Sequence, residues 1–277
     1  MREMTIGQYY STDSLIHRLD PRVKIVNTFV YVISLFFMRN IIMYGAALIV
    51  LLVYIKLSRV PLKYIIKGTK ALFWIIFFTV VLQLFTIQGV ETVFEWHFIR
   101  ITETGIYSAL NLLLRLTLLI IGSSMMTYTT TPNSLTDGLE KLFRWMNKIG
   151  VPVHELSMIM SIALRFIPVL VDELDRIMKV QMARGVDFKE GNIFERIKKL
   201  MPIIVPLFVS AIRRSNELAM AMDARCYHGG EGRTKMKPLE YKRNDHVAYI
   251  LLLGYIAMVI VLRNVLHLGL FDLQMPA

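Results

Sequence analysis

Long apolar runs dominate the first half of the chain, and one more such run lies near its end. They cover residues 23–38, 41–57, 71–87, 105–128 and 247–262, and the last extends at most to Leu270. Each run is close to the ~17–25 residues that an α-helix needs to cross a bilayer at ~1.5 Å per residue. The pattern therefore predicts an all-α integral membrane protein with about five transmembrane helices.

The segment between the fourth and fifth runs has a different pattern. Its apolar stretches, 156–171 and 200–212, contain prolines and are too short for comfortable spans, so we expect buried or interfacial helices there. Start and stop signals predict a short capped helix over 135–147. Two long amphipathic helices are expected to follow, the first ending at Ala183 and the second covering about 202–225.

These patterns divide the chain into three parts, and its charges orient them. Residues 1–128 hold an N-terminal segment and four membrane helices, 129–246 a helical module, and 247–277 the last membrane helix. Cations gather before the first helix and in the loop after the second, whereas acids gather in the loop 91–103. By the positive-inside rule, the N-terminus and the helical module are cytoplasmic and the C-terminus is outside. The first residues show no cleavable signal pattern.

Composition narrows the function classes. The net charge of +11 could serve nucleic acid, but the cations alternate with membrane-length apolar runs, so we expect a membrane protein without a nucleic-acid partner. The single cysteine, Cys226, excludes a disulfide framework, and none of the six histidines pairs with another at i+3 or i+4 to form a helical metal site. The chain also has no phosphate-binding loop sequence of the Gly-x-x-x-x-Gly-Lys-Ser/Thr kind. We expect it to bind no cofactor itself.

Two self-contained activities remain as alternatives. A secondary transporter needs polar groups along a path through the membrane, and Arg115 is the only charge well inside the first four runs. A membrane enzyme that binds a diphosphate through magnesium could use the acidic cluster around Asp172 and Glu173, but no second acidic cluster faces it.

The two long amphipathic helices share an ending. The first closes in Ala183-Arg184-Gly185 and the second in Ala224-Arg225-Cys226. Small neighbours let a helix end approach another surface closely, and a guanidinium can bind carboxylates or carbonyls there in a forked geometry. A single ending of this kind would be an ordinary cationic helix terminus. Because there are two, on similar helices in one module, we interpret them as docking sites.

With these features the chain resembles a known family, EcfT. EcfT is the transmembrane coupling component of energy-coupling factor (ECF) transporters, which are ABC-type transporters. The paired Ala-Arg-Gly-type endings and the order of helices match that family over essentially the whole chain. So does an N-terminal signature, which here reads Gly7-Gln8-Tyr9-Tyr10, then Ser14, then His17-Arg18-Leu19-Asp20-Pro21-Arg22 and Lys24.

The resemblance implies a non-catalytic subunit of an ATP-driven importer in a prokaryotic cell membrane. Two ABC-type ATPases, which hold the ATP and magnesium, would bind Ala183, Arg184, Gly185, Ala224, Arg225 and Cys226. A separate membrane protein, the S-component, would capture a vitamin or other micronutrient, which this chain does not specify. Cys226 departs from the family's glycine, so we expect docking to survive but a left-handed turn to be less favoured there.

Overall fold

The computed structural model describes residues 9–38, 40–87, 92–96, 99–188, 192–229, 236 and 238–267. The chain divides into two compact units. We call the first the membrane-helix unit (Gly7–Leu139 and Leu239–Ala277) and the second the α6–α7 unit (Met1–Ile6 and Glu140–Pro238). The division of the chain at residues 128 and 246, which the sequence predicts from membrane location, is not tested by these compact units and stays a prediction.

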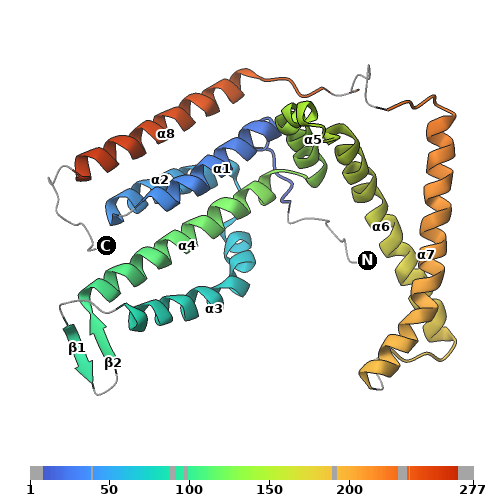
Figure 1. The fold of residues 1–277 in the computed structure, drawn as a ribbon, viewed down its shortest axis with the longest axis horizontal. Coiled ribbons are helices and arrows are strands. Elements are labelled where there is room, and N and C mark those ends of the chain that lie inside the picture. Colours follow the sequence, from blue (N-terminus) through green and yellow to red (C-terminus); the bar gives the residue numbers. More distant parts are fainter. Residues whose placement is uncertain are drawn as a thin grey trace. The chain divides into compact units, whose positions relative to one another are not determined.

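The membrane-helix unit is arranged around one long helix, α4 (Figure 1). Helices α1, α2 and α3 pack against α4, and α8 packs against α1 and α2. The bounds of these helices are α1 Pro21–Phe37, α2 Ile41–Ser58, α3 Leu62–Thr86, α4 Glu103–Thr129 and α8 Arg243–His267. A shorter helix, α5 (Pro132–Phe143), follows α4.

A continuous apolar core joins α1, α2 and α4. Its fully buried side chains include Leu35, Met38, Tyr44 and Leu118. Helices α1 and α4 approach closely at Gly122, where a Cβ atom would lie 2.5 Å from the Tyr31 ring. Only glycine fits this crossing without moving the ring, so Gly122 sets the spacing of the two helices.

The apolar runs of the sequence correspond to helices, but these helices differ in whether they are long and apolar enough to cross a membrane. In the part of the chain that the structure describes, four helices are long and apolar enough to cross a membrane, namely α2, α4, α6 and α8. Helix α3 adds a fifth span if its two limbs, Leu62–Lys70 and Leu72–Thr86, count as one span bent by 63°. Helix α1 has only 17 residues.

The stretch 156–171 was expected to be too short for a span, and that expectation was wrong as regards length. It belongs to α6 (Val153–Ala183), a helix of 31 residues that continues through Pro168. The helix is long and apolar enough to cross a membrane, because Arg165 is the only charge in that apolar stretch. The cytoplasmic location of residues 129–246 stays a prediction.

A small β-hairpin between α3 and α4 was not predicted. Strand β1 (Thr92–Trp96) pairs antiparallel with β2 (Ile99–Thr102), with Glu95 opposite Arg100. Strands of five and four residues are too short for an alternating pattern to stand out. Glu91, in the same predicted outer loop, lies outside the described residues, as do Arg39 and residues 230–235 and 268–277.

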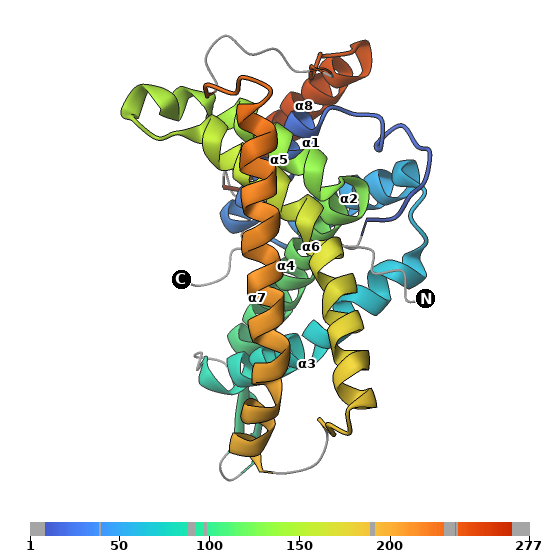
Figure 2. The same cartoon turned by 90° about the vertical axis from the view of Figure 1, so that its right-hand side faces the viewer.

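The α6–α7 unit is a pair of long helices that cross each other (Figure 2). A 3₁₀ helix, η1 (Arg144–Ile149), precedes α6, so the predicted helix 135–147 changes type at Phe143. Helix α7 (Ile193–Asp223) also has 31 residues and begins nine residues before the predicted start at 202. A capping box between Asn192 and Glu195 starts it, and the helix then continues through Pro202 and Pro206.

Candidate functional site

The end of α6 is a well-formed Schellman turn. The Gly185 N–H donates to the Met182 carbonyl at 3.0 Å, and the Val186 N–H donates to the Gln181 carbonyl at 3.1 Å. Gly185 has φ of +87°, the left-handed conformation that this turn requires. Ala183 and Arg184 lie just before this turn and are exposed.

The end of α7 repeats this geometry. The Cys226 N–H donates to the Asp223 carbonyl at 2.9 Å, and the Tyr227 N–H donates to the Met222 carbonyl at 3.1 Å. Ala224, Arg225 and Cys226 thus occupy the same three positions as the α6 tripeptide, and all three are exposed.

The expectation about Cys226 was therefore wrong, since the residue adopts φ of 54°. A left-handed residue with a Cβ costs roughly 1–2 kcal/mol. The two hydrogen bonds of the turn satisfy carbonyls at the helix end, and they offset that cost.

The two helix ends point away from each other. The Gln181 amide donates to the Pro202 carbonyl at 3.4 Å, and Arg214 lies 3.8 Å from Glu173, so early residues of α7 pair with late residues of α6. This pairing is antiparallel. Each helix has 31 residues and is therefore about 46 Å long at ~1.5 Å per residue. Arg184 and Arg225, which follow the last turns of α6 and α7, thus lie at opposite ends of the pair.

Replacing Cys226 by glycine should stabilise the α7 end, because it removes the Cβ from a left-handed position. We expect a gain of about 1 kcal/mol for Cys226→Gly and a similar loss for Gly185→Ala. Thermal unfolding of the purified chain in detergent measures both. Ala221→Gly, an exposed position inside α7, is the matched control and should lower stability. Equal effects of glycine at 221 and 226 would contradict the left-handed assignment.

Arg115 faces protein on the inner side of α4. Its Nε donates to the Tyr44 hydroxyl at 2.9 Å, and its Nη2 donates to the Met38 carbonyl at 3.3 Å. The Tyr44 hydroxyl in turn donates to the same Met38 carbonyl at 3.0 Å. Arg115 therefore binds the carbonyl that ends α1 and ties α1, α2 and α4 together.

We expect Arg115→Leu to reduce the yield and thermal stability of the protein. The substitution leaves the buried Tyr44 hydroxyl and the Met38 carbonyl with one donor fewer, which costs about 1–3 kcal/mol. Arg115→Lys should recover only part of this loss, because one ammonium group cannot replace the guanidinium fork. Size-exclusion chromatography and thermal unfolding in detergent measure both variants, and a leucine variant as stable as the parent would contradict the structural role.

The N-terminal signature forms a polar network within the membrane-helix unit. The Ser14 hydroxyl donates to His17 Nδ1 at 2.7 Å, and His17 Nε2 donates to the Tyr10 carbonyl at 3.0 Å. Burial lowers the pKa of His17, which favours the neutral ring. In that form Nε2 carries the proton that the Tyr10 carbonyl accepts, so Nδ1 accepts from Ser14. Lys24 is buried and donates to the carbonyl of Thr129, the last residue of α4, at 2.8 Å. Gly7 and Gln8 lie outside the described residues.

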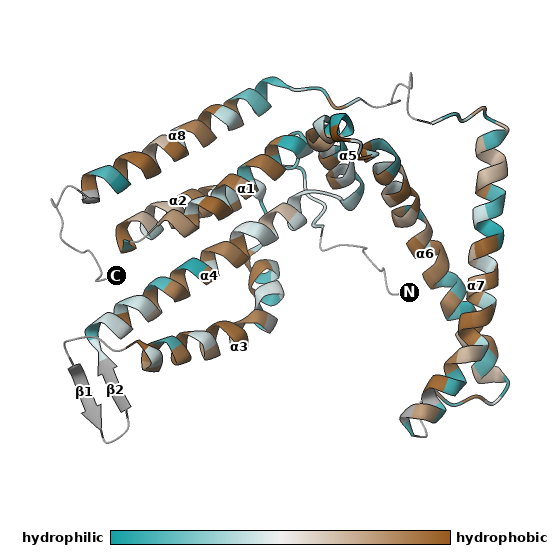
Figure 3. Ribbon diagram, in the orientation of Figure 1, coloured by the Kyte–Doolittle hydropathy of each residue, from teal (hydrophilic) through white to brown (hydrophobic). Residues whose placement is uncertain are grey.

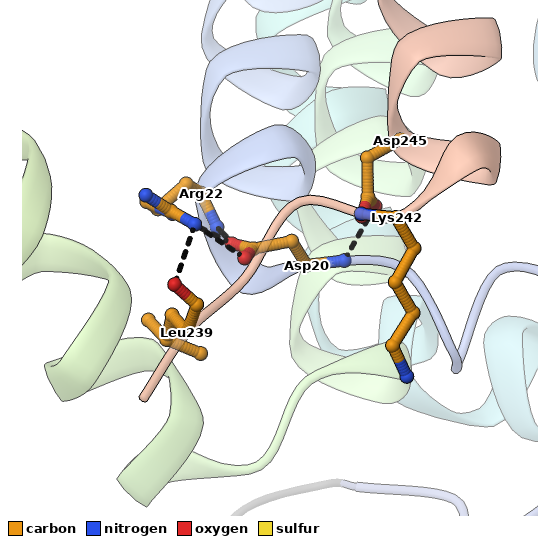
Figure 4. A network of polar contacts seen from close by, with 5 residues as sticks. All are labelled: Asp20, Arg22, Leu239, Lys242 and Asp245. Carbon is orange, nitrogen blue, oxygen red and sulfur yellow. Dashed lines mark hydrogen bonds and ion pairs between the residues drawn. The ribbon is translucent and has the colours of Figure 1, made fainter. Parts of the chain in front are cut away.

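The second half of the signature binds the segment that leads into α8 (Figure 4). The Asp20 carboxylate accepts two hydrogen bonds from the Arg22 guanidinium, which also donates to the Leu239 carbonyl at 3.2 Å. Asp245, which is 1% exposed, accepts from the Asp20 N–H at 2.8 Å and from the Lys242 N–H at 2.7 Å. We call these five residues, Asp20, Arg22, Leu239, Lys242 and Asp245, the polar anchor.

Sequence reasoning did not single out Asp245. The available signal was an acidic residue three positions after Lys242, at the start of an apolar run, a position where a carboxylate caps a helix. Its long-range partner Asp20 is 225 residues away in sequence, and no local pattern predicts such a pairing.

Among the residues that the structure describes, no group of three or more His, Cys, Asp or Glu side chains could hold a metal ion. His154 and Ser157 both bind the Glu140 carboxylate, at 3.0 Å and 2.8 Å. The serine is thus held by the carboxylate and not by the imidazole, so the three do not form a nucleophile and its base.

The bundle of long apolar helices defines a mainly α-helical, multi-pass membrane protein. Residues 12–236 match the CbiQ family, described as cobalt transport protein. The chain is 47% identical over 264 residues to the energy-coupling factor transporter transmembrane protein EcfT of Clostridium kluyveri, with 95% of this chain and 98% of that protein covered. The EcfT proteins of Acidaminococcus fermentans and Bacillus subtilis are 46% and 42% identical, with 95% of this chain and 98% and 99% of theirs covered. The chain therefore belongs to the EcfT family.

Proposed function

We propose that this chain is the coupling subunit of an ECF transporter, which transmits the motion of two ABC-type ATPases to a substrate-binding S-component. The observation that carries the proposal is the pair of Schellman turns that present Arg184 and Arg225, both exposed, at opposite ends of two crossed helices. A helix moves as a rigid rod, so a displacement at its end is passed along its length.

The separation of the two ends bears on how many partners they bind. Helices of about 46 Å that run antiparallel cannot direct both arginines into one small pocket. Two equivalent ends instead suit two copies, or two related chains, of one kind of partner. On this proposal ATP and magnesium are bound by the ATPases, this chain binds no cofactor, and the N-terminus and the α6–α7 unit are cytoplasmic.

Neither alternative activity, a self-contained transporter or a diphosphate-binding enzyme, is favoured by the contacts of the residue on which it would depend. A self-contained transporter would need Arg115 free along a path, but its guanidinium binds the end of α1 and the Tyr44 hydroxyl. A diphosphate-binding enzyme would need Glu173, which lies 3.8 Å from Arg214 in the α6–α7 pairing.

Purification of the tagged chain from its native membrane tests the proposal. We expect two ATPase chains and a small membrane protein to co-purify, and ATP hydrolysis in the preparation to disappear when the ATPases are stripped away. A chain that purifies without ATPases and transports a solute alone in liposomes would contradict the proposal. Mass spectrometry of the intact complex also identifies the S-component, and with it the substrate.

A further inference from the structure

A run of cations connects α2 to α3 and continues into α3. It consists of Lys56, Arg59, Lys63, Lys67 and Lys70, and all five side chains are exposed. The sequence contains no aspartate or glutamate between Asp20 and Glu91. Among the described residues, none of the four lysines forms an ion pair. We call this run the basic limb, and its lysines carry charge that no acidic side chain of the described residues neutralises through an ion pair.

The lysines of α3 share one face of the helix. Lys63, Lys67 and Lys70 are spaced by four and three residues, which places them within an arc of about 60° at ~100° per residue. Ile65 lies on the opposite face and is 2% exposed, packed into the core of the membrane-helix unit. The core contact thus fixes the helix so that its lysines are directed outward.

The basic limb ends where an apolar limb begins. Helix α3 bends by 63° between Leu62–Lys70 and Leu72–Thr86. The second limb contains no charged residue, and its Phe73 and Trp74 are 60% and 72% exposed. Figure 3 shows teal turns in the first limb and mainly brown turns in the second. A cationic helix that bends directly into an exposed apolar helix matches the boundary between headgroups and acyl chains.

We infer that the basic limb binds the phosphate headgroups of anionic phospholipids. Basic residues next to a membrane span, unpaired within the protein, are typical of segments that bind acidic lipid surfaces. The flexible lysine stems let the ammonium groups reach the headgroups while the backbone stays near the apolar limb. This inference goes beyond orientation, because it assigns a lipid class, and it does not depend on ATPase docking.

Lipid retention by the full-length chain tests the inference. The chain is purified in detergent and equilibrated with equal amounts of phosphatidylglycerol and phosphatidylcholine, and bound lipids are counted by native mass spectrometry. We expect the parent to retain phosphatidylglycerol in preference to phosphatidylcholine. In K63Q/K67Q/K70Q the ratio of the two bound lipids should fall at least tenfold, since each lysine strengthens binding to the anionic lipid roughly fivefold. K63R/K67R/K70R keeps the charge and should keep the preference.

The matched control is R144Q/K148Q/K179Q, which removes the same charge from exposed positions of the α6–α7 unit. It should retain phosphatidylglycerol like the parent. Retention that also falls in this control would mean a response to net charge alone and would overturn the inference. So would equal retention of the two lipids, or an unchanged preference in K63Q/K67Q/K70Q. If that variant does not fold, the single variants K63Q, K67Q and K70Q decide, because each should lower the preference roughly fivefold. An unchanged preference in all three would overturn the inference.

Discussion

The double variant Arg184→Ala/Arg225→Ala should abolish ATP-driven uptake while leaving the chain folded in the membrane. Both arginines are exposed and lie just before turns made by backbone atoms, so their side chains are not needed to close those turns. Removing a desolvated arginine from an interface typically costs about 2 kcal/mol or more. That is roughly a thirtyfold loss of affinity at each end, so single variants should be impaired and the double variant inactive.

Three controls separate docking from a general effect of charge or helix stability. Arg184→Lys/Arg225→Lys keeps the charge but loses the planar fork, so uptake should still fall well below the parent. Arg176→Ala/Arg213→Ala removes two exposed arginines from the same helices away from their ends, and should transport normally. If the arginines only complement the helix dipole, worth ~0.3–1 kcal/mol, the double alanine variant will be slightly less stable and fully active. That outcome, at equal expression, would remove the docking role.

Removal of the Asp245 carboxylate should destabilise the membrane-helix unit strongly. Asp245→Ala leaves the buried N–H group of Asp20 and the part-buried N–H group of Lys242 without their acceptor. A buried group left unpaired costs about 1–3 kcal/mol, and the second group adds to that cost. The loss should therefore be about 3 kcal/mol, seen as a lower unfolding temperature in detergent. Asp245→Asn keeps one acceptor oxygen, so it should be intermediate.

A second variant tests the other half of the polar anchor. Arg22 stacks 3.8 Å from the centre of the Tyr241 ring and forks onto Asp20, and a lysine keeps its charge but loses both geometries. Arg22→Lys should lower stability by about 1–2 kcal/mol. Asp175→Ala, an exposed acid on α6, is the matched control and should change little. Equal stability of Asp245→Ala and Asp175→Ala would contradict the anchor.

The length of the apolar runs predicted most of the membrane helices, because an apolar run long enough to cross a bilayer has few alternatives to a helix. It located α2 and α4 to within a few residues and placed the ends of α6 and α7 close to Ala183 and Arg225. The start of α7 was predicted less well, because the sequence carries two competing signals there. Prolines at 202 and 206 indicated a later start for α7, but the capping box at Asn192 begins the helix earlier.

At the candidate site, too, some features could be predicted from the sequence and others could not. The sequence identifies the two Ala-Arg endings, since they are contiguous and repeated. It does not reveal that Cys226 is left-handed, because that follows from hydrogen bonds that a glycine-based rule does not consider. Nor does it reveal Asp245 as the partner of Asp20, or the antiparallel crossing that separates Arg184 from Arg225, since both depend on tertiary contacts.

Site-directed cross-linking tests most directly the claim that each helix end binds its own ATPase. In a Cys226→Ser background, cysteine replaces Met182 or Asp223, which are exposed and each lie two residues before one of the arginines, so that Arg184 and Arg225 stay in place. The purified complex is cross-linked, and the products are sized by mass. Each single variant should capture one ATPase chain, and the variant with both cysteines should capture two on one copy of this protein. Capture of the same ATPase chain from both positions, or of no ATPase from either, would contradict the account.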